Sequence, residues 1–200
     1  MQCVEICDIS QQRDNQELIE QLEKLKWEEF MQKEKILEIL KRGIKSEVDG
    51  FQFYKTAAEK TEDSKAKDAF NLLAEDEIKH EQMLKEQYKK VKKSGKLKFE
   101  KEDDDSKLDA TSPYPIFSEN FKEKLLKEQG FEMSALSIGI MLEQNSIDFY
   151  RNSAEQIDDL DAKALFNYLA EWEGEHLKAL VNQQKVLQED FWTEARFYPF

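Results

Sequence analysis

The chain contains an internal repeat with an offset of 96 residues. The segment LAEDEIKHEQML at 73–84 recurs as LAEWEGEHLKAL at 169–180, and the alignment continues on the N-terminal side without a gap. Between residues 47 and 85, 16 of the 39 positions carry the same residue as the position 96 later. Agreement of this extent indicates a duplicated structural unit. We therefore expect two similar halves that bury their apolar faces against each other.

Each half of the repeat predicts two long helices joined by a short polar turn. Apolar residues recur at spacings of three, four and seven, which is typical of amphipathic helices. The chain has only 6 Gly and 3 Pro among 200 residues, which favours helices over a sandwich or barrel. Repeat 1 spans about 36–91, with helices at 36–59 and 66–91, and repeat 2 spans about 134–188, with helices at 134–156 and 161–188. The expected fold is an all-α, antiparallel four-helix bundle made of two duplicated helical hairpins.

The segments outside the repeat have separate expectations. Residues 34–200 form the predicted bundle domain, within which a polar segment at 92–133, broken by glycine and proline, reads as a long crossover. A short helix is predicted inside it at 118–130. The aromatic tail, 189–200, is expected to fold back on the bundle or on a partner.

Residues 1–33 are expected to form an extra N-terminal helix, called the arm below. Asp14 and Glu17 have the spacing of a capping box, which predicts a helix start at that point. The arm either packs on its own bundle or joins two chains in a homodimer. Its candidate packing positions are Leu18, Leu22, Leu25 and Phe30.

Composition excludes several classes of function. The net charge of −13 argues against a nucleic-acid partner. The most apolar run, 135–142, is too short to span a bilayer, and the N-terminus lacks the pattern of a secretory signal, so a cytoplasmic location is expected. Cys3 and Cys7 are too few for a four-thiolate metal site or a disulfide scaffold, and they are expected to be free thiols.

Ionisable residues interrupt the predicted apolar faces at matching places in both repeats. Glutamates stand on the core face of the first helix of each hairpin, and a Glu-x-x-His pair stands on the core face of the second. The two histidines of these pairs are the only histidines in the chain. In each hairpin the two glutamates are equally distant from the turn, which places them at one depth of the bundle. The six residues are Glu47, Glu77, His80, Glu143, Glu173 and His176.

Four buried carboxylates need compensation, because an unpaired buried charge costs several kcal/mol. The apolar faces hold no lysine or arginine at this level, which leaves protonation with hydrogen bonding, or metal binding. Four carboxylates balance the charge of two divalent cations, and oxygen with imidazole nitrogen suits iron or manganese, with zinc as an alternative. One Glu from each of two helices and Glu-x-x-His from each of the other two is also the ligand set of di-iron and di-manganese carboxylate bundles. The residues therefore predict a metal site, and satisfied polar core groups are the alternative.

The pattern Glu-x6-Tyr-x22-Glu-x2-His, present twice, resembles the rubrerythrin-like branch of the ferritin-like superfamily over about residues 35–190. The resemblance implies two iron ions per chain. It further implies that Glu77 and Glu173 bridge the two ions. Glu47 and Glu143 would each be terminal on one iron, with His80 and His176 as the nitrogen ligands.

The resemblance also implies a function, with two departures from the family pattern. Such sites reduce O2 or peroxide, or oxidise Fe(II), as an iron pair cycles between the di-ferrous and di-ferric states. The chain lacks the four cysteines of a rubredoxin domain, so an external electron donor is expected. The additional glutamate of rubrerythrins is replaced by Ser146, whose repeat partner is Gly50. Alternatives are a non-catalytic iron-binding or buffering module and a metal-stapled helical interaction protein.

Two repeated tyrosines are further candidates for the site. Tyr54 and Tyr150 lie about 10 Å along the helix axis from Glu47 and Glu143 on the same face. They are expected either to hydrogen-bond groups around the metal ligands or to act as redox-active phenols, and plain packing tyrosines are the alternative. Trp172, next to Glu173, is expected to pack, to shield the site or to quench oxidising equivalents.

Overall fold

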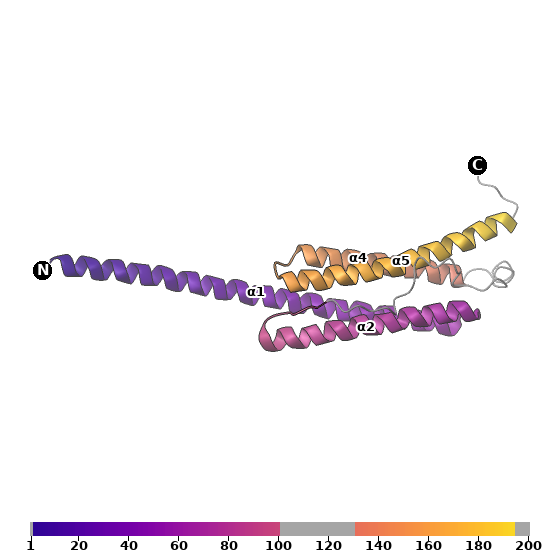
Figure 1. Ribbon diagram of the computed structural model, residues 1–200, viewed down its shortest axis with the longest axis horizontal. Helices are drawn as coiled ribbons and strands as arrows, with labels where there is room; N and C mark the ends of the chain where they lie inside the picture. The colour runs from indigo at the N-terminus through magenta and orange to yellow at the C-terminus, as the bar shows by residue number, and fades with distance from the viewer. Residues whose placement is uncertain (1, 101–130, 195–200) are drawn as a thin grey trace.

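The computed structural model describes residues 2–100 and 131–194, which form four α-helices. They are α1 (Gln2–Lys60), α2 (Ser64–Ser94), α4 (Phe131–Glu155) and α5 (Leu160–Glu194). Helices α1 and α2 form one antiparallel hairpin, α4 and α5 form the other, and the hairpins pack side by side through α1 and α4 (Figure 1). The predicted all-α bundle of two hairpins is confirmed.

Equivalent aspartates begin the second helix of each hairpin. The Asp63 side chain accepts a hydrogen bond from the Ala66 N–H at 2.9 Å, and Asp159 accepts one from the Ala162 N–H at 2.8 Å. Such N-caps satisfy backbone donors that the first helical turn leaves open. Because Asp63 and Asp159 are 96 residues apart, both hairpins turn at the same point and align their helices in the same register.

The apolar core consists of two clusters, and each contains residues from both repeats. In one cluster, Tyr54 and Phe70 of the first repeat stack at 6.3 Å between ring centroids, and Leu180 of the second repeat packs with them. In the other, Tyr150 and Phe166 stack at 6.2 Å, with Leu84 of the first repeat. Along each helix the six ionisable residues lie between these clusters. Each half therefore completes the core of the other and closes one end of the polar centre.

The arm is continuous with the first bundle helix. Helix α1 is 59 residues long and passes through Asp14 without interruption, so the predicted helix start there is wrong. The sequence before Gly43 contains no glycine or proline that would end a helix. Leu18, Leu22 and Leu25 are 48–57% exposed, because this part of the arm projects beyond the bundle (Figure 1).

Helices α2 and α5 extend beyond their predicted ends, and the structure describes the first part of the predicted crossover, 92–100. Helix α2 continues to Ser94 and ends at Gly95, whose φ of 75° suits a glycine and whose N–H bonds to the Val91 carbonyl. Helix α5 continues to Glu194, so the predicted aromatic tail begins as helix. The predicted helix at 118–130 and the residues after Glu194 lie outside the described part of the chain. Within that part, no helix is long and apolar enough to cross a membrane.

Candidate metal centre

Six ionisable side chains from four helices meet in the middle of the bundle. All six predicted residues are between 0% and 4% exposed. Their ligand atoms form two groups, and within each group all atoms lie within 4.8 Å of one another. Glu77 and Glu173 belong to both groups; Glu47 and His80 complete the first, and Glu143 and His176 complete the second. The fold thus brings together the six residues that the sequence singles out.

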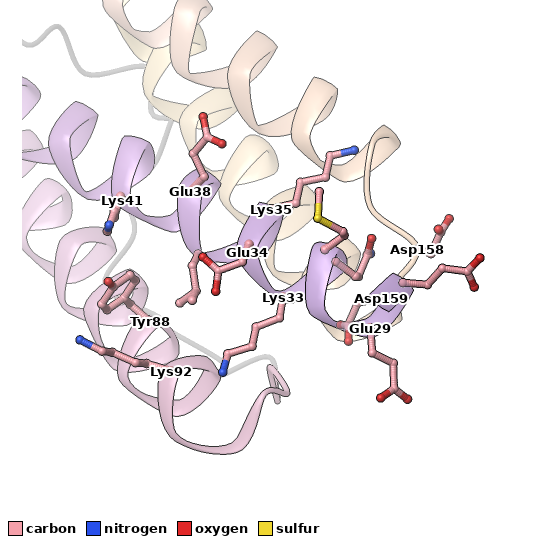
Figure 2. Close-up of a pocket in the computed structure, with 14 residues that line it drawn as sticks. Glu29, Lys33, Glu34, Lys35, Glu38, Lys41, Tyr88, Lys92, Asp158 and Asp159 are labelled. Atoms are coloured by element: carbon pink, nitrogen blue, oxygen red, sulfur yellow. The ribbon is translucent and has the colours of Figure 1, made fainter. Parts of the chain in front are cut away.

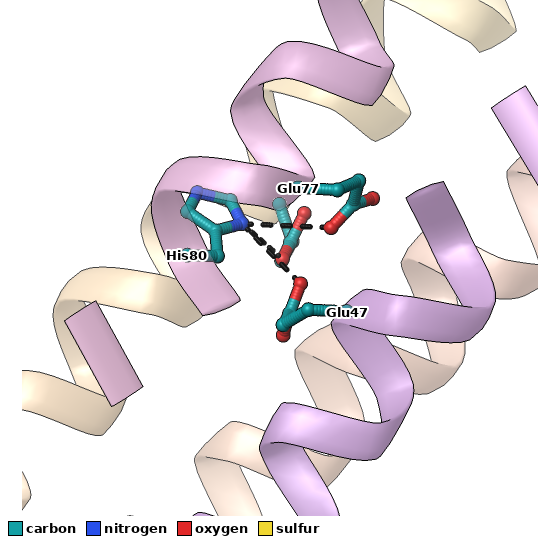
Figure 3. A group of neighbouring side chains, drawn as sticks. Glu47, Glu77 and His80 are labelled. Carbon is teal, nitrogen blue, oxygen red and sulfur yellow. Dashed lines mark ion pairs between the residues drawn. The ribbon is translucent and has the colours of Figure 1, made fainter. Parts of the chain in front are cut away.

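Both imidazoles present Nδ1 to the carboxylates. His80 Nδ1 lies 3.0 Å from Glu173 Oε1 and 3.5 Å from Glu47 Oε2, and Figure 3 shows His80 and Glu77 on α2 converging with Glu47 on α1. His176 Nδ1 lies 3.0 Å from Glu173 Oε2 and 3.8 Å from Glu143 Oε2. The three-residue spacing of Glu-x-x-His puts both groups of each pair on one helix face. Oxygen and nitrogen donors therefore point at a common centre.

The two repeated tyrosines cross over between the repeats. The Tyr54 hydroxyl donates a hydrogen bond to Glu143, and the Tyr150 hydroxyl donates one to Glu47. Repeated glycines make room for the rings: a Cβ at Gly139 would lie 3.3 Å from the Tyr54 hydroxyl, and Gly43 plays the same part for Tyr150. Burial, followed by the nearby glutamate charges, raises the pKa of both tyrosines well above the usual value, so both remain donors.

The carboxylates differ in their affinity for protons. Burial, with the charges of Glu173 and Glu47, raises the pKa of Glu77 well above its usual value. Burial and the Glu173 charge raise the pKa of Glu143 to about 7. Glu173 behaves oppositely: burial alone would raise its pKa, but His80 and His176 hold the pKa well below the usual value. At neutral pH the cluster therefore keeps protons that an arriving cation must displace.

The pKa values of the two histidines are also raised. Burial alone would lower the pKa of His80, but the charge of Glu173, followed by that of Glu47, raises the pKa well above the usual value. For His176, burial is likewise outweighed by Asp76, Glu143 and Glu173. The surrounding carboxylates thus favour protons on both rings.

Asp76 belongs to the centre and was missed by the sequence reasoning. It is fully buried, with Oδ2 at 3.2 Å from His176 Nε2 and Oδ1 at 2.8 Å from Lys79 Nζ. Burial would raise the pKa of Asp76, but the hydrogen bonds from His176 and Lys79 lower it overall. Its repeat partner is Trp172, so comparing the repeats gave no sign of it. The available signal was an acidic residue directly before Glu77 on a helix facing the second repeat.

Gly50 provides the space that the Glu77 carboxylate occupies. A Cβ at Gly50 would lie 2.9 Å from Glu77 Oε1, closer than a side chain can approach without a shift.

We predict that Gly50→Ala displaces this carboxylate and weakens metal binding by about 10-fold, as measured by competition with a chelator. Gly174→Ala is the control, because no heavy atom lies within 4 Å of a Cβ there. The control should keep its metal affinity and gain about 0.5–1 kcal/mol of stability. Equal metal affinity of Gly50→Ala and the unaltered protein would contradict this role of Gly50.

A surface hollow at the base of the arm is separate from the centre. It is lined by charges of both signs, including Glu29, Lys33, Lys41 and Asp158, and the labelled side chains in Figure 2 spread over its rim without converging. The buried centre has convergent donors, whereas this hollow has none among its labelled residues. Of these two sites, only the buried centre brings several metal-binding donors to one point.

Comparison with known proteins agrees with this geometry. The sequence model of the Rubrerythrin family matches residues 38–183, a span that holds all six residues of the centre and leaves out the arm. No curated protein matches the chain. Among solved structures, a hypothetical protein from Pyrococcus furiosus is similar, with 27% identity and a TM-score of 0.55 over 77% of this chain and 90% of that one. The chain belongs to the Rubrerythrin family.

Proposed function

We propose that the protein is a di-iron carboxylate oxidoreductase that reduces O2 or peroxide, or oxidises Fe(II), and takes electrons from a separate donor. The observation that supports this most is the sharing of Glu77 and Glu173 between the two ligand groups. A carboxylate that belongs to both groups has one oxygen for each of two cations. Four carboxylates also neutralise two divalent ions, which removes the repulsion that adds to burial in raising the pKa of Glu77.

The donor set supports two iron ions per chain, with manganese or zinc as alternatives. Glu47 and His80 would hold one ion, Glu143 and His176 the other, and Glu77 and Glu173 would bridge them. Hard oxygen donors with one imidazole per ion suit Fe(II). Bound iron would supply two-electron redox chemistry toward O2 or peroxide.

The chain's own residues would orient the ligands and exclude water. Tyr54 and Tyr150 hold Glu143 and Glu47 by hydrogen bonds across the repeats. The two apolar clusters cover the centre from both ends, so the centre is dry once its ligands are filled. A dry, oriented ligand set is the contribution that a protein makes to metal redox chemistry.

The redox proposal is tested by anaerobic loading with Fe(II), rapid mixing with O2 or peroxide, and near-ultraviolet absorbance. The expected result is rapid oxidation followed by repeated cycles when a reductant is supplied. A single oxidation without turnover would favour the alternative of a buffering module. No oxidation of the loaded protein would overturn the redox assignment.

Loss of either tyrosine hydroxyl should weaken metal binding without unfolding the bundle. Tyr54→Phe frees the Glu143 carboxylate and Tyr150→Phe frees Glu47, while both rings keep their stacking partners. Loss of such an outer hydrogen bond costs about 10–100-fold in metal affinity. Chelator competition checks this, with Tyr168→Phe as the control outside the ligand shell. Unchanged affinity in both variants would show that the hydroxyls only pack.

The arm supports a homodimer as a second part of the proposal. Leu18, Leu22 and Leu25 follow a spacing of four and three along one side of α1, and all are exposed in a single chain. Such a side is buried when two helices pair. Light scattering should give twice the chain mass, and Leu22→Glu with Leu25→Glu should give the mass of one chain. A monomer in the unaltered protein would remove this part of the proposal.

We also propose that the protein works in the cytoplasm and that its function needs no nucleic acid.

A further inference from the structure

The two halves of the centre differ behind their histidines. Asp76 and Trp172 occupy equivalent positions in the two repeats, and each directly precedes a shared glutamate. Each also lies against the histidine of the other repeat. Asp76 Oδ2 is 3.2 Å from His176 Nε2, whereas the Trp172 ring meets the His80 ring edge-to-face, with centroids 4.6 Å apart at 83°. The symmetry of the six ligands is therefore broken at the residue behind each imidazole.

On the His176 side, a carboxylate fixes the tautomer. Asp76 accepts the Nε2–H of His176, so Nδ1, which lies 3.0 Å from Glu173 and 3.8 Å from Glu143, is the nitrogen that can give up its proton and bind a cation. Lys79 holds Asp76 in place from the other side at 2.8 Å. A carboxylate behind a ligating histidine sets its orientation and makes the ligand more basic. The Glu143–His176 position is thus preorganised for a cation.

On the His80 side, this support is missing. Within residues 2–100 and 131–194, nothing hydrogen-bonds to His80 Nε2. The indole of Trp172 carries only a donor, so it cannot accept a proton from this nitrogen. Glu47 and Glu143 do not offset this difference between the two histidines, because each accepts a hydrogen bond from a tyrosine hydroxyl. Since Glu77 and Glu173 serve both positions, the residue behind the histidine is the main difference between them.

We propose that the two metal positions bind unequally and that Asp76 is the positioning residue that makes the Glu143–His176 position the tighter one. The inference rests on the proposed metal site and adds an order of filling to it. The Glu143–His176 position fills first and empties last. The Glu47–His80 position, backed by Trp172, exchanges its ion with solution. If Fe(II) is the substrate, the exchangeable Glu47–His80 side is where it would enter and leave.

The test is a titration of the metal-free protein with Co(II), followed by visible absorbance and calorimetry, which needs no turnover. The unaltered protein should show two steps, with affinities that differ by about 10-fold or more. Asp76→Asn should weaken the tighter step by about 10–100-fold and bring the two steps together. Asp68→Asn, an exposed acid on the same helix, is the control for the charge change and should leave both steps apart.

A reciprocal variant tests the same difference from the other half. Trp172→Gln supplies an acceptor behind His80 and should strengthen the weaker step, with the melting temperature of the metal-free variant as the check on folding. If this variant does not fold, the Asp76→Asn titration decides alone. Two equal steps in the unaltered protein, or equal weakening of both steps by Asp76→Asn, would overturn the inference and leave the two-metal site standing. No Co(II) binding at all would overturn the metal site itself.

Discussion

Glu77→Gln is expected to lose most of its bound metal and, when metal-free, to melt at a higher temperature than the unaltered protein. Glu77 is 4% exposed, and burial with the charges of Glu173 and Glu47 raises its pKa. An amide keeps the shape and is neutral at any pH, whereas buried Glu77 without a cation must either take up a proton on folding or bear a costly charge. In the loaded protein the same change removes a ligand from both positions. Loss of a supporting partner costs about 10–100-fold in affinity, and loss of a shared ligand should cost at least the upper figure.

Metal content after dialysis and melting curves with and without metal measure both effects. Glu75→Gln, on the exposed side of the same helix, is the matched control and should change neither. A Glu77→Gln protein that keeps its metal and melts lower when metal-free would mean that Glu77 is a structural acid. The opposite signs of the two effects separate a metal ligand from a stabilising core group.

Metal-free and metal-loaded protein are expected to respond to pH in opposite directions between about pH 4.5 and 7. The pKa of Glu143 rises from 4.5 to about 7 on folding without metal. A raised pKa adds stability below the unfolded value, and this stability is lost as pH rises through the folded value. The pKa values of Glu77, His80 and His176 are also raised, so their contributions have the same sign. The metal-free protein should therefore become less stable as pH rises.

The loaded protein should become less stable as pH falls, because protons displace the cations from their ligands. Glu173 and Asp76 have lowered pKa values, so their stability is lost only at more acidic pH and does not reverse the trend. In the metal-free protein, the full pKa shift of Glu143 alone corresponds to about 3 kcal/mol in the free energy of unfolding. This equals a change of about 5–10 °C in melting temperature. Melting curves of both forms across this window measure the effect. Parallel curves would contradict a cluster whose protons and cations compete.

The repeat made the buried cluster predictable, because the same residue types appear twice at the same depth. Glu47 and Glu143 were identified by their distance from the turns, and the structure places them with the Glu-x-x-His pairs. The repeat also concealed Asp76, because its equivalent is Trp172 and its partner, His176, lies across the interface. A contact between the hairpins depends on how they pack, which spacing along one helix does not specify.

The tyrosines and the arm show the same limit. Tyr54 and Tyr150 could be placed on the core face, but their bonds to Glu143 and Glu47 depend on the crossing of α1 and α4. The helix start predicted at Asp14 was wrong. A capping pattern favours the start of a helix, but it does not stop a helix that already runs through it. Without a glycine or proline nearby, the backbone simply continues through it as α1.

The most direct test of the two-metal centre is a crystal structure of the iron-loaded protein with data collected at the iron absorption edge. Two anomalous peaks about 3.5–4 Å apart are expected between Glu77 and Glu173. One peak should lie beside Glu47 and His80, and the other beside Glu143 and His176. No peak among these six residues at full iron loading, or a single peak that leaves one of the two histidines uncoordinated, would contradict the centre.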